Sequence, residues 1–369
     1  MKVAMISARF HPYVGGAEKQ ALELSVALRA RGAEIQVVTR RENGCPAVEE
    51  VRGVPVRRLA AFGSPAFMVS LAAYLFSKGK GFDVYHSHLA SSHAVVAALA
   101  ARLFGAKAVV KLGGGVGVGE IARSRGTALG RLKLAALAAL KPTLVAVNAD
   151  QPAELNGTGL EKLPLHVIPN GVDLETYKPA REELRRELRK SFQWEGKVFL
   201  FVGRLDSDKG QSEALSVFLE GFKRAGSPGL FVVVGEGPKR AQLEARAREL
   251  GLGASVRFMG AAQGDVSLVY RGADVFVQPS HSEGLSNALL EALASGLPVL
   301  ASKVTGIEGL IEDGRQGRLF DPRSAADVER VLKELASARL EDMGREARAK
   351  ADAYSIEKAA GRYLELYSR

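Results

Sequence analysis

The stretch that decides the fold is Ser280-His281-Ser282-Glu283-Gly284-Leu285-Ser286-Asn287-Ala288-Leu289-Leu290-Glu291. The apolar run 274–278 before it predicts a buried strand, and Pro279 ends that strand because proline cannot donate a ladder hydrogen bond. The leucines within the stretch recur at helical spacing, so a helix follows the loop. Free backbone N–H groups at a helix start bind anions. With Glu283 and Glu291 on either side, the stretch predicts a ligand with hydroxyls as well as phosphate, as in a sugar nucleotide.

Either Ser286 or Asn287 is suited to cap the helix predicted at 288–295. The same order of strand, loop and helix recurs along the chain. In the first half, strands are predicted at 3–7, 35–39, 54–59, 83–86, 108–112, 144–147 and 166–168, and helices at 17–31, 66–78, 91–104 and 128–140. In the second half, strands are predicted at 198–202, 230–234, 256–259, 274–278, 299–301 and 317–320, and helices at 212–223, 239–250, 288–295 and 325–335.

This alternation predicts an α/β protein with two doubly wound, Rossmann-like domains, each built on a parallel sheet. A turn-rich segment at 169–173 marks the boundary, which gives domains at 1–170 and 171–354 and a final helical segment at 355–369. Ligands of such sheets bind beyond the carboxyl ends of the strands, so we expect the site in a cleft between the two domains.

Composition is that of a globular protein: 369 residues, 47% hydrophobic and 25% charged. The single cysteine, Cys45, excludes an internal disulfide and suits a reducing, cytoplasmic compartment. We expect no signal peptide and no membrane span, because no run of sufficient apolar length occurs.

The net charge of +10 is unevenly distributed. Residues 1–170 contain 21 Lys and Arg against 11 Asp and Glu, whereas residues 171–369 contain 30 of each. A basic first half suits an anionic acceptor, an anionic membrane surface or nucleic acid, and an Arg-rich soluble domain is the plain alternative. Nucleic acid is the remote choice, because aromatic residues are only 7% of the chain and do not alternate with the basic ones.

A second chemistry-bearing segment covers residues 201–210, at the end of a predicted strand. Arg204 and Lys209 can both reach a diphosphate there, although a solvated basic loop is the alternative. Asp206 and Asp208 could be mistaken for a metal-binding pair, but no histidine or further carboxylate cluster accompanies them. We therefore expect no metal.

The first half contributes further polar segments at predicted strand ends. Gly15 and Gly16 form a turn that lets backbone approach a phosphate or sugar. His86 and His88 end the strand at 83–86, where contact with a substrate and packing against a helix are both open. A glycine-rich loop at 113–119 follows Lys111 and could order around an acceptor.

A helical pattern at 128–140 follows that glycine-rich loop, and basic residues flank and interrupt it. It is compatible with a basic helix resting on a membrane surface, and also with an internal packed helix.

These segments together resemble the family-4 retaining glycosyltransferases of the GT-B fold, over nearly the whole chain. The most specific match is the pair Glu283 and Glu291, seven residues lying between them, followed by Gly296-Leu297-Pro298-Val299. The other matching segments are Gly203-Arg204-Leu205 with Lys209-Gly210, Val234-Gly235-Glu236-Gly237-Pro238, Ile168-Pro169-Asn170-Gly171-Val172-Asp173 and Gly15-Gly16-Ala17-Glu18.

The resemblance implies a retaining, metal-independent, hexosyl-type transfer from a nucleoside-diphosphate sugar to an acceptor hydroxyl, in cell-envelope glycan, glycolipid or polysaccharide synthesis. It makes 171–354 the donor domain and 1–170 the acceptor-side domain, to which the last helix returns. Arg204 and Lys209 would hold the diphosphate, Glu283 the sugar hydroxyls and Glu291 the ribose hydroxyls. The remaining donor contacts would come from Gly15, Gly16, Met259, Gly260, Gly284, Leu285, Ser286 and Asn287.

One departure from the family pattern lies at Gly113. Many members have a Thr-x-His pattern there, with the histidine close to the donor sugar, whereas this chain has Lys111-Leu112-Gly113. His86, His88, Lys111 and Gly113 are therefore candidates for an acceptor or sugar contact, and the donor sugar stays open. The alternative activities are a sugar-nucleotide epimerase, which would convert the donor without acceptor, and a phosphorylase, which would need pyridoxal phosphate.

Overall fold

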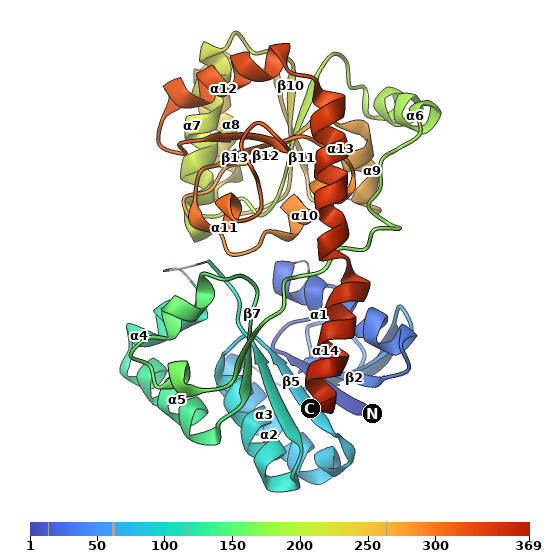
Figure 1. Ribbon diagram of the computed structural model, residues 1–369, viewed down its shortest axis with the longest axis vertical. Helices are drawn as coiled ribbons and strands as arrows, with labels where there is room; N and C mark the ends of the chain where they lie inside the picture. The colour runs from blue at the N-terminus through green and yellow to red at the C-terminus, as the bar shows by residue number, and fades with distance from the viewer. Residues whose placement is uncertain (14, 61–62, 116, 118, 263) are drawn as a thin grey trace. The chain divides into compact units, whose positions relative to one another are not determined.

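Two sheets organise the chain, each the centre of its own unit. The computed structural model describes residues 1–13, 15–60, 63–115, 117, 119–262 and 264–369 (Figure 1). Unit 1 consists of Met1–Gly171 and Ile356–Arg369, and unit 2 of Val172–Ser355. The prediction of two α/β units is confirmed.

Unit 1 contains a sheet of eight strands in the order β3-β4-β2-β1-β5-β6-β7-β8. The strands are β1 (Lys2–Ser7), β2 (Glu34–Arg40), β3 (Val48–Val51), β4 (Val54–Leu59), β5 (Val84–His88), β6 (Lys107–Lys111), β7 (Thr143–Ala146) and β8 (Leu165–Val167). All neighbours pair in parallel except β3, which pairs antiparallel with β4.

The antiparallel strand β3 corrects the expectation of a purely parallel sheet. Its sequence, Val-Glu-Glu-Val, is short and charged, as suits a sheet edge, and gives little strand signal. It pairs with β4 across residues 52–53, and so forms a tight hairpin with a strand that the periodicity does predict.

Helices cover both faces of this sheet. They are α1 (Gly16–Ala30), α2 (Gly63–Lys78), α3 (Ser92–Phe104), α4 (Glu120–Arg125), α5 (Ala128–Leu140) and α14 (Ile356–Ser368). Val3 and Met5 of β1 pack with α1 and α14 on one face, while Ala4 and Ile6 pack with α2 and α3 on the other. The last helix, red in Figure 1, lies beside α1, so chain segments more than 300 residues apart share one core.

Unit 2 contains six strands, all parallel, in the order β11-β10-β9-β12-β13-β14. They are β9 (Val198–Val202), β10 (Leu230–Val234), β11 (Val256–Gly260), β12 (Val275–Gln278), β13 (Val299–Ser302) and β14 (Gly317–Phe320). The strands are apolar at successive positions because both faces are covered: Leu200 faces one core and Phe201 the other.

The helices of unit 2 are α6 (Glu182–Phe192), α7 (Gln211–Arg224), α8 (Arg240–Glu249), α9 (Ser267–Gly272), α10 (Asn287–Ala294), α11 (Thr305–Glu308), α12 (Ala325–Ser337) and α13 (Leu340–Ala351). Periodicity did not predict α6 or α13. Helix α6 has no fully buried residue, but Leu184, Leu188 and Phe192 recur at helical spacing and are partly buried, so the sequence did contain a signal for this helix.

The order of strands places one switch point in each unit. In unit 2 the chain runs outward from β9 through β10 to β11, then returns to β12 on the other side of β9. In unit 1 the chain likewise leaves β1 through β2, and β5 returns to its other side. At a switch point the connecting loops diverge, which leaves a crevice at the carboxyl ends of the two strands.

Candidate functional site

Two loops meet at the carboxyl ends of β9 and β12, the switch point of unit 2. Lys209, after β9, lies with Nζ 2.5 Å from Oε1 of Glu283, which follows β12. The Glu283 side chain is 2% exposed and the Lys209 side chain 36% exposed. A buried carboxylate needs a cation close by, so this pair fixes both loops.

Backbone hydrogen bonds hold the same two loops together. The N–H groups of His281 and Ser282 both donate to the carbonyl of Lys209, at 2.9 and 3.1 Å. Lys209 itself has φ +63°, a left-handed conformation that costs a non-glycine residue energy. The cross-loop bonds offset that cost, and the conformation aims the lysine at Glu283.

Arg204 lies on the same loop and pairs with Asp206, with Nη2 3.1 Å from Oδ2. Its side chain is 54% exposed, so the guanidinium borders solvent. Asp206 thus has a cationic partner, whereas the side chain of Asp208 lies outside the described part of the structure. Within the described ranges, no group of three or more His, Cys, Asp or Glu is placed to hold a metal ion.

The helix after Glu283 begins as a capped N-terminus. Ser286, one of the two expected capping residues, is the N-cap of α10, and its Oγ accepts from the Leu289 N–H at 3.3 Å. The same hydroxyl donates to Gln278 Oε1 at 3.1 Å, which ties the helix start to the end of β12. The backbone of residues 284–287 therefore lies at the positive end of the α10 dipole.

Glu291 lies inside α10 and is only 6% exposed. Its Oε2 accepts a hydrogen bond of 2.8 Å from the hydroxyl of Tyr270. Burial, and then the neighbouring Glu291, raise the pKa of Tyr270 well above its usual 10, so the tyrosine stays a donor. The sequence did not predict this contact of Glu291, because Tyr270 belongs to no motif and lies 21 positions from its partner.

The loops after β9, β10 and β11 are bonded in series. Gly203 N–H donates to Val234 O at 3.0 Å, and Gly235 N–H donates to Gly260 O at 2.7 Å. A Cβ on Gly235 would lie 1.8 Å from Gly203 O, so the approach requires glycine. Met259, at the end of β11, is 39% exposed beside this series of loops.

Unit 1 presents its predicted glycine turn at the start of α1. Gly15 is the N-cap and Gly16 the first helical residue. A Cβ on Gly15 would lie 2.2 Å from Oε2 of Glu18. A hollow of about 550 Å³ lies beside this turn and is lined by Pro12, Tyr13, Arg40, Arg41, Glu42, Asn43, Cys45 and Gly63.

His86, His88 and Lys111 lie together on one face of the unit 1 sheet. His88 pairs in register with Lys111 on the neighbouring strand, and the two imidazole rings stack with centroids 4.8 Å apart. Tyr363 and Tyr367 of α14 cover them: Tyr367 hydrogen-bonds to His86 Nδ1, and the Tyr363 ring lies 5.0 Å from the His86 ring. His86 and His88 are at most 1% exposed and Lys111 is 5% exposed.

Gly113 lies on the loop beyond Lys111, where the family pattern has histidine. A Cβ at this position would lie 2.2 Å from Cδ2 of Leu89, so the leucine fills the space that a side chain would take. Gly113 N–H donates to Oε1 of Glu120 at 2.8 Å, and Ala90 N–H donates to the same oxygen at 3.2 Å. Burial raises the pKa of Glu120, opposed by these hydrogen bonds.

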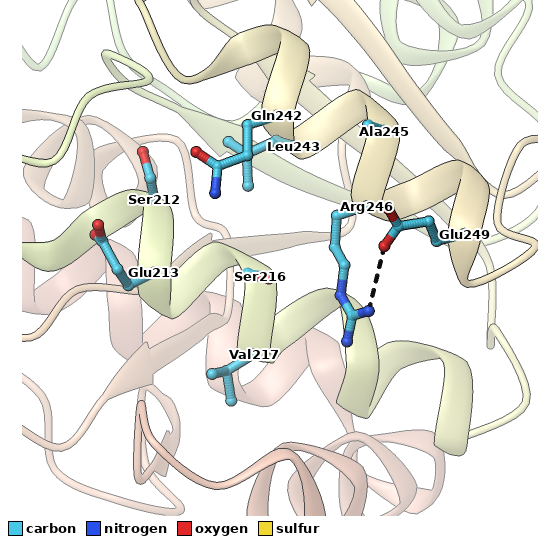
Figure 2. Close-up of a pocket in the computed structure, with 9 residues that line it drawn as sticks. All are labelled: Ser212, Glu213, Ser216, Val217, Gln242, Leu243, Ala245, Arg246 and Glu249. Carbon is cyan, nitrogen blue, oxygen red and sulfur yellow. Dashed lines mark hydrogen bonds and ion pairs between the residues drawn. The ribbon is translucent and has the colours of Figure 1, made fainter.

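A groove of about 450 Å³ runs between α7 and α8 of unit 2 (Figure 2). Its lining residues are Ser212, Glu213, Ser216, Val217, Gln242, Leu243, Ala245, Arg246 and Glu249. No residue predicted from the sequence as a site residue lines it. The arginine that lines this groove, Arg246, already forms ion pairs with Glu249 and Glu220.

Gly306→Ala tests whether the Glu283 loop is fixed by close packing. A Cβ there would lie 2.1 Å from Glu283 O and 2.3 Å from Gly284 O. We expect the free energy of unfolding of unit 2 to fall by about 1–3 kcal/mol, as for other overpacked sites. Urea unfolding followed by the fluorescence of Trp194, buried in unit 2, measures it. Gly309→Ala is the control, since its Cβ would meet nothing within 4 Å, and equal losses would contradict the packing argument.

Lys111→Met tests the burial of the lysine in unit 1. Burial lowers the pKa of Lys111 from its usual 10.5 to about 7, so the folded state gives up a proton that the unfolded state keeps. The resulting destabilisation is complete below about pH 7 and fades as pH rises toward 10.5. We expect Lys111→Met to raise the free energy of unfolding by roughly 3–5 kcal/mol at pH 6–7, and to change it little near pH 10.

Calorimetric unfolding from pH 6 to 10, in a buffer without phosphate or carboxylate, measures the effect of Lys111→Met. Lys162→Met is the control, because Lys162 is exposed in the same unit and carries the same charge. A gain in the free energy of unfolding that does not change with pH would contradict the burial of a charged Lys111.

Two family profiles match the chain. The profile described as "Glycosyl transferases group 1" matches residues 184–355, and "Glycosyltransferase Family 4" matches residues 14–176. A D-inositol 3-phosphate glycosyltransferase from Frankia alni is 31% identical, over 87% of this chain and 86% of that protein.

Solved structures match over the full chain. Sucrose-phosphate synthase from Thermosynechococcus elongatus has a TM-score of 0.79 at 21% identity, covering 100% of this chain and 98% of the other. HepE from Anabaena, solved with UDP-glucose, has a TM-score of 0.81 at 19% identity, covering 100% and 99%. The structures establish the GT-B fold class, and the sequence matches establish the family: the chain belongs to the group 1 glycosyl transferases, with an N-terminal part of glycosyltransferase family 4, and is a glycosyltransferase.

Proposed function

We propose that this glycosyltransferase binds a nucleoside-diphosphate sugar in unit 2 and transfers the sugar, with retention of anomeric configuration, to an acceptor held by unit 1. The observation that carries the proposal is the Lys209–Glu283 pair at the β9/β12 switch point, beside the capped start of α10. The UDP-glucose complex of HepE supports a nucleotide-sugar donor.

Charge stabilisation is the catalytic task of this site. When the bond to the sugar breaks, negative charge develops on the leaving diphosphate. Arg204 has a planar guanidinium with several N–H donors at the edge of the solvent. The Lys209 ammonium has three N–H donors, and one of them donates a hydrogen bond to Glu283. Together with the N–H groups at the start of α10, these cations stabilise the charge as it forms.

The carboxylates hold hydroxyl groups in this proposal. Glu283, fixed by Lys209, accepts hydrogen bonds from the donor sugar, and the backbone from Gly284 to Asn287 contacts sugar and phosphate. Glu291, oriented by Tyr270, accepts from the ribose hydroxyls. The nucleobase lies along Met259 and Gly260, and the Gly15–Gly16 turn contributes to the donor or acceptor from unit 1.

Arg204→Ala and Glu283→Gln separate the two roles. We expect Arg204→Ala to weaken both donor binding and turnover, because it removes a diphosphate contact. Glu283→Gln keeps the shape but leaves Lys209 without its anion, so we expect turnover to fall by about 10²–10³-fold, the range for losing one preorganised polar group. A thermal-shift screen against UDP-, GDP-, ADP- and dTDP-sugars identifies the donor, and transfer is then assayed with it.

Arg246→Ala is the control for charge, since Arg246 is a half-exposed, carboxylate-paired arginine in the same unit. Near-normal donor binding and turnover in both site variants would overturn the assignment.

The same positive charges account for metal independence, and retention is a further part of the proposal. Arg204, Lys209 and the α10 start supply the positive charge that a divalent cation supplies elsewhere. The product is formed by attack on the face that the diphosphate leaves, with Glu283 as a positioning group. We expect transfer to continue in excess EDTA, and ¹H NMR of the product to show the anomeric configuration of the donor. Loss of activity that Mg²⁺ or Mn²⁺ restores, or an inverted anomer, would contradict this.

The acceptor side faces a cytoplasmic membrane surface in this proposal, consistent with envelope glycan or glycolipid synthesis. In the described part of the chain, no helix is both long and apolar enough to cross a bilayer. Helix α5 packs through Leu134 and Leu137, yet its first turns expose Leu129 and Leu132 by 80% and 67%. Exposed leucines in a basic half suit a shallow, charge-assisted contact with anionic lipid.

We expect binding to vesicles that rises with phosphatidylglycerol content and falls with salt, because surface charge attraction is screened. Replacing Leu129 and Leu132 with serine should reduce it in a co-sedimentation assay. Val48→Ser is the control, since Val48 is 60% exposed on the far-edge strand β3. Equal binding to neutral vesicles would count against the contact.

A further inference from the structure

Unit 1 buries a lysine that has no anion beside it. Lys111 is the last residue of β6 and is 5% exposed. Among the residues that the structure describes, no carboxylate lies within ion-pair distance of Lys111. Its ammonium lies over the Tyr363 ring, with Nζ 6.0 Å from the ring centroid. Glu120 is committed to other groups, the N–H groups of Gly113 and Ala90.

Buried polar atoms without hydrogen-bond partners surround this lysine. Burial lowers the pKa of His86 to about 3, so its ring is neutral and carries one proton. Tyr367 hydrogen-bonds to Nδ1, and with the phenol hydroxyl taken as the donor the ring proton is assigned to Nε2. That Nε2, the Nε2 of His88 and the hydroxyl of Tyr363 are all buried without a hydrogen-bond partner.

A ligand that satisfies this group must accept hydrogen bonds and carry negative charge. A cation is repelled by Lys111, and a neutral hydroxyl or water leaves the ammonium uncompensated. The oxygens of a phosphate or carboxylate group supply both acceptors and charge. His88 and Lys111 end neighbouring strands beside the β1/β5 switch point, where ligands of such sheets bind.

We propose that Lys111, His86, His88 and Tyr363 form a binding site for a single oxyanion, a phosphomonoester or a carboxylate. On the function proposed above, this oxyanion belongs to the sugar acceptor, so the enzyme glycosylates an anionic molecule and recognises its charged group in unit 1. Lys111 stands where many family members have the threonine of the Thr-x-His pattern.

Inorganic phosphate and, separately, acetate are the probes, titrated into the full-length protein. Long-range ¹H–¹⁵N spectra follow the imidazole nitrogens of His86 and His88, assigned with His86→Phe and His88→Phe. The titrations are made in an Arg204→Ala, Lys209→Ala background, which removes the proposed diphosphate contacts of unit 2. A response to phosphate alone indicates a phosphorylated acceptor, and a response to acetate alone indicates an acidic sugar or other carboxylate.

Lys111→Met is expected to weaken the binding at least about tenfold, a difference of about 1.4 kcal/mol. Lys111→Arg should retain part of it, and Tyr363→Phe should weaken it less, since it removes one donor only. Lys162→Met, which changes net charge equally at an exposed position, should bind as the parent does. Equal affinity in Lys111→Met and Lys162→Met, or no change at His86 and His88, overturns the site.

The binding of acetate, whose charge does not change between pH 6 and pH 9, should also weaken over this range as Lys111 loses its proton. The other titratable groups facing the cluster are His86 and His88 on β5, His93 on α3, and Tyr363 and Tyr367 on α14. Burial keeps these histidines neutral and these tyrosines protonated, so none of them supplies a competing charge across this range. Affinity that is constant from pH 6 to pH 9 would contradict the role of Lys111.

Failure of this site and failure of the proposed function give different results. Donor binding in unit 2 is measured on the parent protein by the thermal-shift screen. Lys111→Met should leave the donor-induced shift in melting temperature unchanged. Donor binding without an oxyanion response overturns the acceptor site alone, whereas an oxyanion response without any donor binding overturns the proposed donor.

Discussion

The ion pair of Lys209 and Glu283 is the interaction on which the candidate site of unit 2 depends. Each residue follows a different central strand of the same sheet, so the pair closes the crevice that the strand order opens. Glu283 is almost fully buried, and leaving such a charge without a partner typically costs about 3–5 kcal/mol. In the function proposed above, the pair positions a carboxylate for hydroxyl groups and an ammonium for phosphate in one arrangement.

Close backbone packing makes that arrangement rigid. Lys209 O accepts two N–H groups from the Glu283 loop, and Gly306 lies against the carbonyls of residues 283 and 284. On the other side, the loops after β9, β10 and β11 are bonded in series through Gly203, Gly235 and Gly260. The glycines of the family segments thus allow backbone contacts that no side chain would leave room for.

The two units treat buried charge in opposite ways. In unit 2, Glu283 and Glu291 each have a partner, Lys209 and the hydroxyl of Tyr270. In unit 1, Lys111 is buried among neutral imidazoles and phenols, with unpartnered polar atoms around it. A paired charge is part of a preorganised arrangement, whereas an unpaired buried charge destabilises the fold, which is why we propose a binding site at the Lys111 cluster.

The sequence by itself determined the two α/β units, the loops after β9 and β12, and the residue types of the proposed donor site. Those features are local: apolar runs of strand length, proline and glycine at strand ends, and a serine before a helix. Only the tertiary structure decided the Glu291–Tyr270 bond, the edge strand β3, the burial of His86 beneath α14, and the filling of the Gly113 position by Leu89. Each joins segments through packing or strand pairing, which depends on the arrangement in space and leaves no periodic pattern along the chain.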